Sequence, residues 1–130
     1  MRALSSEEGR TMTSPEEFFA GHPAALQVFD TVRAEAERLG PVEVRVTRSQ
    51  VAFRRRRGFA YVWLPGRWLW NPSSEVVLSL ALDHRIPSGR FKRVVRPSPR
   101  TWMHHLEVRD VSDVDDEVSG WLADAYRGAG

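Results

Sequence analysis

Side chains that could bind an anion are concentrated in two stretches of this sequence. The first stretch contains a run of four arginines followed by two tryptophans: Arg54, Arg55, Arg56, Arg57, Trp68 and Trp70. Guanidinium groups bind phosphate and carboxylate through paired N–H donors, and exposed aromatic rings can stack on nucleic-acid bases. These six residues are therefore candidates for ligand contact, with Trp68 and Trp70 forming one wall of a pocket.

Two structural alternatives apply to the same residues. Tryptophan usually supplies buried area, so Trp63, Trp68 and Trp70 could belong to the core or to its edge. The arginines could be neutralised inside the molecule by the acidic start of the last helix, which contains Asp115 and Asp116.

The second stretch combines Ser88, Arg90 and Lys92, which supply a hydroxyl, a forked donor and a compact cation within five positions. If residues 90–96 form a strand, Arg90 and Lys92 share one face of it, because side chains alternate along a strand. Two cations on one face suit a phosphate or a carboxylate. The alternative is a loop whose basic side chains remain in solvent.

Two consecutive histidines follow these cations in the chain. On a regular strand His104 falls on the side of Leu106, which is the pattern of a hydrogen-bonded core histidine. His105 falls on the polar side and is the better candidate for a ligand contact or a proton transfer. Both are kept as candidate ligand-binding residues, and their opposite directions argue against one shared metal ion.

Signals for catalysis are weak throughout the chain. There is no cysteine, which excludes thiolate nucleophiles, disulfides and cysteine-based zinc sites. No phosphate-cradling glycine loop and no glycine-framed serine nucleophile occurs. We therefore assign no catalytic residue, no metal ligand and no cofactor, and the sequence favours a binding protein over an enzyme.

Charge is distributed unevenly along the 130 residues, although the net charge is only +2. Residues 42–109 hold fourteen basic and four acidic residues, a net charge of +10, between ends of net charge −3 and −5. A basic block of this kind attracts anionic partners. No segment is long and apolar enough for a membrane helix and the N-terminal residues do not form a signal peptide, so we expect a soluble, cytoplasmic protein.

The periodicity predicts helices first, then strands, then a last helix. Residues 1–13 are expected to be a disordered polar tail and residues 14–130 a single domain. Ser14 and Pro15 mark a helix start, and a helix is predicted over residues 23–39, ended by Gly40. From residue 42 the period is two, which predicts strands.

Six further segments, five strands and a last helix, complete the predicted fold. Residues 51–55 and 59–64 form a hairpin in which Gly58 supplies a positive φ. Strands are predicted over residues 76–82, 90–96 and 102–109, and the last helix over residues 113–126. Strands that are not interleaved with helices indicate an α+β fold with a largely antiparallel sheet of about five to six strands.

A family resemblance is carried by three groups of residues. They are the loop Ser88, Arg90, Phe91 and Lys92, the strand residues Trp102, His104 and His105, and the helix pairs Trp121-Leu122 and Ala125-Tyr126. These residues, within a match of roughly residues 15–127, resemble the small bacterial domains called domain of unknown function 5655. The resemblance implies a fold but no established activity. Related domains also occur fused to nuclease-like domains, which favours a role with nucleic acid.

Three functional hypotheses follow from these observations. The first is a small module that holds an anionic ligand, either nucleic acid or a phosphorylated small molecule, on a basic sheet face. The second is an accessory or protein-interaction subunit that forms a homodimer. The third is a hydrolase or transferase that uses His105 as acid or base, with Arg90 and Lys92 clamping an anionic substrate.

Overall fold

The computed structural model describes residues 13–67 and 74–130. Within these residues the elements are α2 (Pro15–Phe18), α3 (Pro23–Leu39), β1 (Glu43–Val46), β2 (Val51–Arg54), β3 (Gly58–Trp63), η1 (Pro65–Arg67), β4 (Val76–Leu82), β5 (Arg93–Ser98), β6 (Thr101–Val108), η2 (Val111–Asp113) and α4 (Asp116–Gly128). The six strands form one antiparallel sheet in the order β1-β2-β3-β4-β6-β5. The predicted α+β fold is confirmed.

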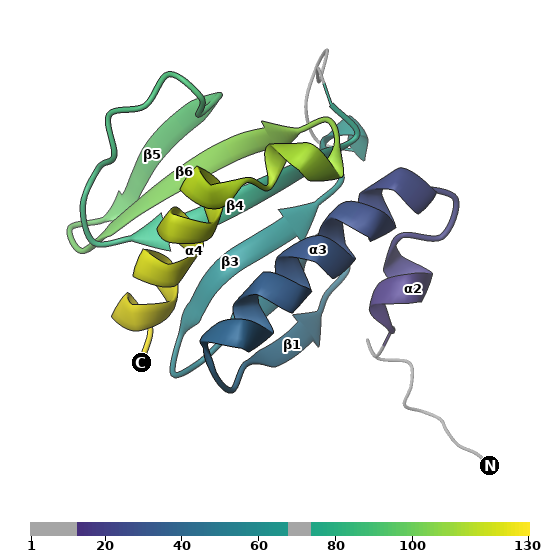
Figure 1. Cartoon of the computed structure of the whole chain (residues 1–130), viewed down its shortest axis with the longest axis horizontal. Helices are drawn as coiled ribbons and strands as arrows, with labels where there is room; N and C mark the ends of the chain where they lie inside the picture. The colour runs from purple at the N-terminus through teal and green to yellow at the C-terminus, as the bar shows by residue number, and fades with distance from the viewer. Residues whose placement is uncertain (1–12, 68–73) are drawn as a thin grey trace.

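Helices α3 and α4 lie on one face of this sheet, which we call the covered face (Figure 1). The opposite face, which carries no helix among the described residues, is called the open face. The covered face is closely packed: Phe29 of α3 stacks on Phe53 of β2 with ring centroids 5.3 Å apart, and both are 0 % exposed. Burial of such aromatic surface is the main term that stabilises the fold.

Local sequence signals explain why the helices begin and end where they do. Ser14 and Glu17 form a capping box at α2, each side chain bonding the backbone N–H of the other. Helix α3 ends at Gly40, whose φ of +147° few other residues adopt. The hydroxyl of Tyr126 occupies the place of a Cβ there and donates to the carbonyl of Pro41, so the end of α3 is fixed against α4.

The strand register separates the side chains of the two faces. On β4, Leu78 and Leu80 point to the covered face, and Val77, Ser79 and Ala81 point to the open face. Pairing places Tyr61 and His105 on either side of Ser79, and places Trp63 beside Val77. The open face therefore carries adjacent rows of side chains from β3, β4 and β6.

Three local predictions are wrong. Gly58 does not have a positive φ among the described residues; instead the hydroxyl of Tyr61 lies where its Cβ would be, so glycine is needed for close approach. Strand β5 begins at Arg93 rather than Arg90. Helix α4 begins at Asp116 with Asp115 as its N-cap, because the preceding residues form the turn η2.

Some predicted features lie outside the described residues. They are the polar tail, apart from Thr13, and the proposed pocket wall of Trp68 and Trp70.

Candidate functional site

The arginines at the tip of the β2–β3 hairpin contact the C-terminal end of α4. Arg55 donates to the carbonyl of Tyr126 at 2.9 Å, and its guanidinium lies 4.1 Å from the centre of the Tyr126 ring. Arg57 donates to the carbonyl of Gly128 at 2.6 Å. The backbone N–H groups of Arg56 and Arg57 both donate to the carbonyl of Ala129.

These contacts give the arginine run a structural role. The last carbonyls of a helix have no partner within it and carry partial negative charge, which nearby cations and N–H donors stabilise. The crowding of like charges at the tip is therefore offset by the end of α4 rather than by acidic side chains. Arg54, which precedes the tip, lies 3.8 Å from Glu43 on β1.

Arg90 is also held by the helix layer. Its Nη1 lies 3.0 Å from Asp115 and 2.8 Å from Glu117, and its Nη2 donates to the carbonyl of Asp113. The hydrogen bonds that Arg90 donates to Glu117 and then to Asp115 raise the pKa of Arg90 above its already high value. Arg90 therefore fixes the loop after β4 to the start of α4.

Ser88 and Lys92 lie on either side of Arg90 in this loop. The Ser88 hydroxyl accepts the Arg90 backbone N–H at 3.2 Å and so shapes the turn. Lys92 is half exposed, and its Nζ lies 3.7 Å from Glu107. The expected arrangement of Arg90 and Lys92 on one strand face is not formed, because both residues precede β5 and Arg90 turns toward α4.

The two consecutive histidines point to opposite faces of the sheet, as the alternation predicts. His104 is 0 % exposed on the covered face. Its Nε2 accepts the Ile86 N–H at 3.0 Å, which leaves Nδ1–H to donate to the carbonyl of Trp102 at 3.1 Å. Both ring nitrogens are thus used inside the core, and we leave His104 out of the site. Burial lowers the pKa of this imidazole.

His105 lies on the open face and belongs to a hydrogen-bonded network. Its Nδ1 is 2.6 Å from the hydroxyl of Ser79, which also accepts the indole N–H of Trp63 at 2.8 Å. The ring of Trp63 meets the imidazole edge-on, with centroids 5.9 Å apart. Ser79 is only 2 % exposed, so it orients His105 and is not accessible as a nucleophile.

The network also assigns the tautomer of His105. If the Ser79 hydroxyl accepts from Trp63, its own hydrogen is free to donate to Nδ1, and the imidazole proton then resides on Nε2. Burial, followed by the nearby charge of Arg93, lowers the pKa of His105. The neutral imidazole is therefore the main form at pH 7 and offers one N–H donor.

A cavity of about 450 Å³ surrounds this histidine on the open face. We call it the His105 pocket, and it is lined by Trp63, Val77, Lys92, Arg93, Val95, His105 and Glu107. Arg93 pairs directly with His105 across β5 and β6, and it has no carboxylate partner among the described residues. The cations that line the pocket with His105 are therefore Lys92 and Arg93, where the sequence had suggested Arg90 and Lys92.

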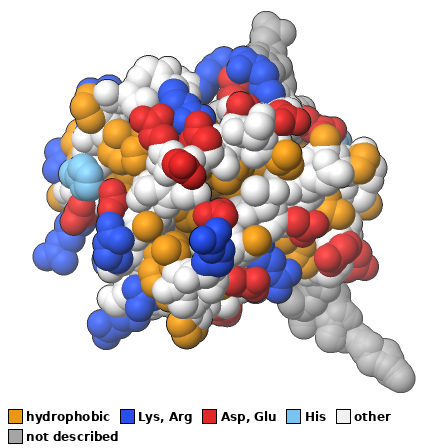
Figure 2. Space-filling model, in the orientation of Figure 1, with side chains coloured by type: hydrophobic (Ala, Val, Ile, Leu, Met, Phe, Trp, Pro, Cys, Tyr) orange, Lys and Arg blue, Asp and Glu red, His pale blue; other side chains and the backbone are white. Residues whose placement is uncertain are grey.

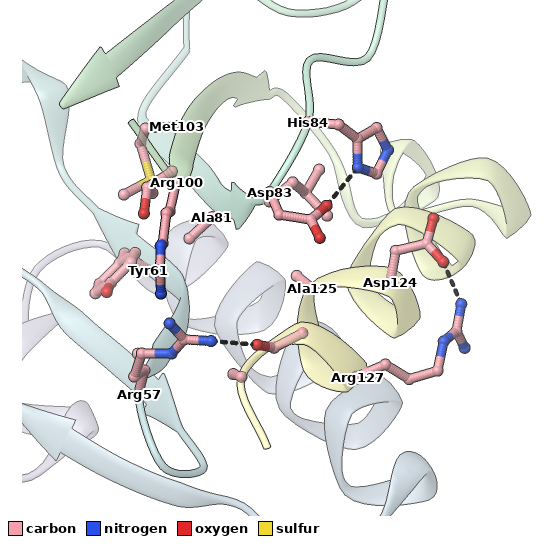
Figure 3. Close-up of a pocket in the computed structure, with 15 residues that line it drawn as sticks. Arg57, Tyr61, Ala81, Asp83, His84, Arg100, Met103, Asp124, Ala125 and Arg127 are labelled. Atoms are coloured by element: carbon pink, nitrogen blue, oxygen red, sulfur yellow. Dashed lines mark hydrogen bonds and ion pairs between the residues drawn. The ribbon is translucent and has the colours of Figure 1, made fainter. Parts of the chain in front are cut away.

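A second cavity, of about 590 Å³, lies where the strands β3, β4 and β6 meet the end of α4 (Figure 3). We call it the Arg100 cleft. Tyr61, Ala81 and Met103 line it from the open face, and Arg57 and Arg100 from two hairpin turns. Its two acidic residues already have partners, since Asp83 accepts from His84 at 2.7 Å and Asp124 pairs with Arg127.

Sequence reasoning missed Ser79, Arg93 and Arg100 as site residues. Alternation alone places Ser79 beside Val77 and Ala81 on one face of its strand. That β4 pairs with β6 rather than with β5 is decided only by the fold, and this pairing is what brings Ser79 to His105.

Residues 13–67 and 74–130 contain no group of three or more histidine or acidic side chains placed to hold a metal ion. None of the helices in these ranges has the length and apolar character needed to cross a bilayer. On the helix side of the molecule, basic and acidic side chains are interspersed (Figure 2).

Comparison with known proteins gives one result. Curated proteins and solved structures yield no significant match to this chain. A family model, described as domain of unknown function (DUF5655), matches residues 16–129. The match covers α3, α4 and all six strands of the sheet, and the chain therefore belongs to the DUF5655 family.

Proposed function

We propose that this protein is a small binding module that holds an anionic ligand with a planar ring in the His105 pocket. Nucleic acid in single-stranded form and a phosphorylated small molecule such as a nucleotide share this chemistry. The observation that carries the proposal is the position of Arg93, a cation without a carboxylate partner among the described residues, beside the partly exposed rings of Trp63 and His105.

Each wall of the pocket has a separate task in this proposal. Trp63 offers a ring on which a base can stack, and Val77 and Val95 give an apolar floor. Arg93 binds a phosphate oxygen, and the Nε2–H of His105 donates one hydrogen bond. Lys92 contributes less, because its charge is partly offset by Glu107 at 3.7 Å. A cytoplasmic setting, where such ligands are abundant, is part of the same proposal.

The structure makes the other hypotheses weaker candidates. The hydrolase or transferase hypothesis used Arg90 as a clamp beside His105, but Arg90 is engaged by Asp115 and Glu117 on the α4 side. The homodimer hypothesis requires an exposed surface, and the partly apolar open face is the candidate interface. The same experiment separates the homodimer from ligand binding.

The test is a titration of labelled single-stranded RNA and DNA, and of a nucleoside triphosphate, at several salt concentrations. We expect affinity to fall with salt, with a log–log slope of about 0.7 for each phosphate contact. Arg93→Ala should reduce that slope by about this amount. Trp63→Leu should weaken oligonucleotide binding with little change in the slope, because stacking carries no charge.

Arg48→Ala is the matched control for these variants. Arg48 is exposed in the turn between β1 and β2, away from the pocket. Its replacement by alanine removes the same charge as Arg93→Ala. Equal effects of Arg48→Ala and Arg93→Ala, or no salt-dependent binding of any probe, would refute the proposal. Light scattering on the same samples checks the mass: a dimer that Trp63→Leu dissociates would assign the open face to self-association instead.

A further inference from the structure

The Arg100 cleft contains two guanidinium groups that no acidic side chain neutralises. Arg100 is exposed and has no hydrogen-bond or ion-pair partner among the described residues, and Arg57 has only the carbonyl of Gly128. The two side chains enter from different turns, and their charged ends point toward one another (Figure 3). Such an approach of like charges is unfavourable unless an anion lies between them.

The rest of the cleft does not supply that anion. Asp83 is bonded to His84, which lowers the pKa of this carboxyl and keeps it ionised and paired. Asp124 is paired with Arg127 on the far side of the cleft (Figure 3). The carbonyls at the end of α4 already accept from Arg55, Arg57 and the tip backbone.

Further donors and an apolar wall surround the two arginines. A guanidinium has five N–H donors, and one is used by Arg57, so both side chains retain free donors. The hydroxyl of Tyr61 has no partner among the described residues, and desolvation raises the pKa of this phenol, so it remains a donor. Ala81 and Met103 form a wall that lowers the local dielectric and strengthens a charged contact.

We propose that the Arg100 cleft is an oxyanion-binding site in which Arg57 and Arg100 bind a phosphate or carboxylate group, with Tyr61 as a third donor. This site is separate from the His105 pocket, and the two cavities share no lining residue. The two cavities nevertheless reach neighbouring side chains of the open face, because Tyr61 of the cleft and His105 of the pocket flank Ser79 of β4.

The test follows backbone amide shifts by NMR while inorganic phosphate is added, with acetate as the carboxylate probe. We expect saturable shifts at Arg57, Tyr61 and Met103. Arg100→Ala should weaken phosphate binding about tenfold, since it removes one charge-assisted contact. Tyr61→Phe should weaken it about threefold, since it removes one neutral donor. Arg48→Ala should leave it unchanged.

Two results would overturn this assignment. One is the absence of saturable shifts with both anions, and the other is equal weakening by Arg48→Ala and Arg100→Ala. Because the exposed Arg100 side chain makes no hydrogen bond or ion pair with the described residues, its replacement should leave the melting temperature unchanged, which separates lost binding from lost fold.

A second arm identifies the source of the oxyanion. A dinucleotide with a 5′-phosphate is compared with the same dinucleotide lacking it. If the cleft holds the end of a nucleic-acid strand, the 5′-phosphate improves affinity and Arg100→Ala cancels the gain. If inorganic phosphate binds but the 5′-phosphate does not improve dinucleotide affinity, the cleft is a phosphate site that is independent of nucleic-acid binding. Oligonucleotide binding that depends on Arg93 and not on Arg100 would leave the proposed function intact and show that the cleft does not hold the end of the bound strand.

Discussion

The covered and open faces of the sheet are built from the same strands but differ in how their polar side chains are buried and hydrogen-bonded. His104 and His105 show the contrast within two consecutive residues. His104 is fully buried, with both nitrogens bonded to backbone groups, while His105 is partly exposed and bonded through Ser79 to Trp63. The covered face uses polar groups to complete the core, and the open face leaves donors available.

The arginines divide in the same way. Arg55, Arg57 and Arg90 are bound to the ends of α4, so they hold the helix layer in place. Arg93 and Arg100 line cavities at the open face and have no partner side chain among the described residues. Net positive charge in the sequence therefore has two uses, which are to hold the ends of α4 and to line cavities, and Arg57 serves both, because it also lines the Arg100 cleft.

The largest expected difference between the faces is in core packing. Phe29→Ala on the covered face should lower the free energy of unfolding by about 3–5 kcal/mol, because it leaves a cavity among Phe19, Phe53 and the helix layer. Met103→Ala on the open face should cost less than about 1.5 kcal/mol, because that side chain is only partly buried. Urea unfolding measures both, and equal losses would contradict the distinction.

The two histidines give the next largest contrast. His104→Ala should cost about 2–4 kcal/mol of unfolding free energy, because it opens a cavity and leaves the Ile86 N–H without its acceptor. His105→Ala should cost about 1 kcal/mol. In the ligand titration the order should reverse, since only His105 faces the pocket.

The pH dependence sharpens this contrast. Both imidazoles have a lowered pKa in the folded state, so the unfolded chain takes up protons first as the pH falls through about 6.5. The contribution of each histidine to stability should be complete above this value and fall as the pH is lowered from 7.5 to 5.5. His105→Asn should remove its share of that loss, measured by urea unfolding at the two pH values.

The smallest effects are expected at the hairpin tip. Arg55→Ala and Arg57→Ala should each cost about 0.5–1 kcal/mol of unfolding free energy, because each removes a donor to the end of α4. Arg56→Ala is the matched control within the run. Its contact to Ala129 is made by the backbone, so the loss should be near zero. Equal losses at all three positions would show that the tip acts through general charge instead.

Much of the fold was predictable because it depends on neighbours in the chain. The apolar period of α3 and the alternation in β4 and β6 predict the bounds of these elements within a residue, since burial of one face requires those spacings. The predicted opposite directions of His104 and His105 are confirmed for the same reason. The errors at Gly58, Arg93 and Asp115 occur where a close side-chain contact, a distant ion pair or a short turn changes the local preference.

The sequence by itself determined which residues form helices and strands, the basic middle of the chain, and the face to which each strand residue points. Tertiary structure alone decided which strands are neighbours, and this placed Ser79 against His105 and Arg93 beside it. It also decided that the arginine run meets the end of α4, because a contact across about seventy residues leaves no local pattern in the chain.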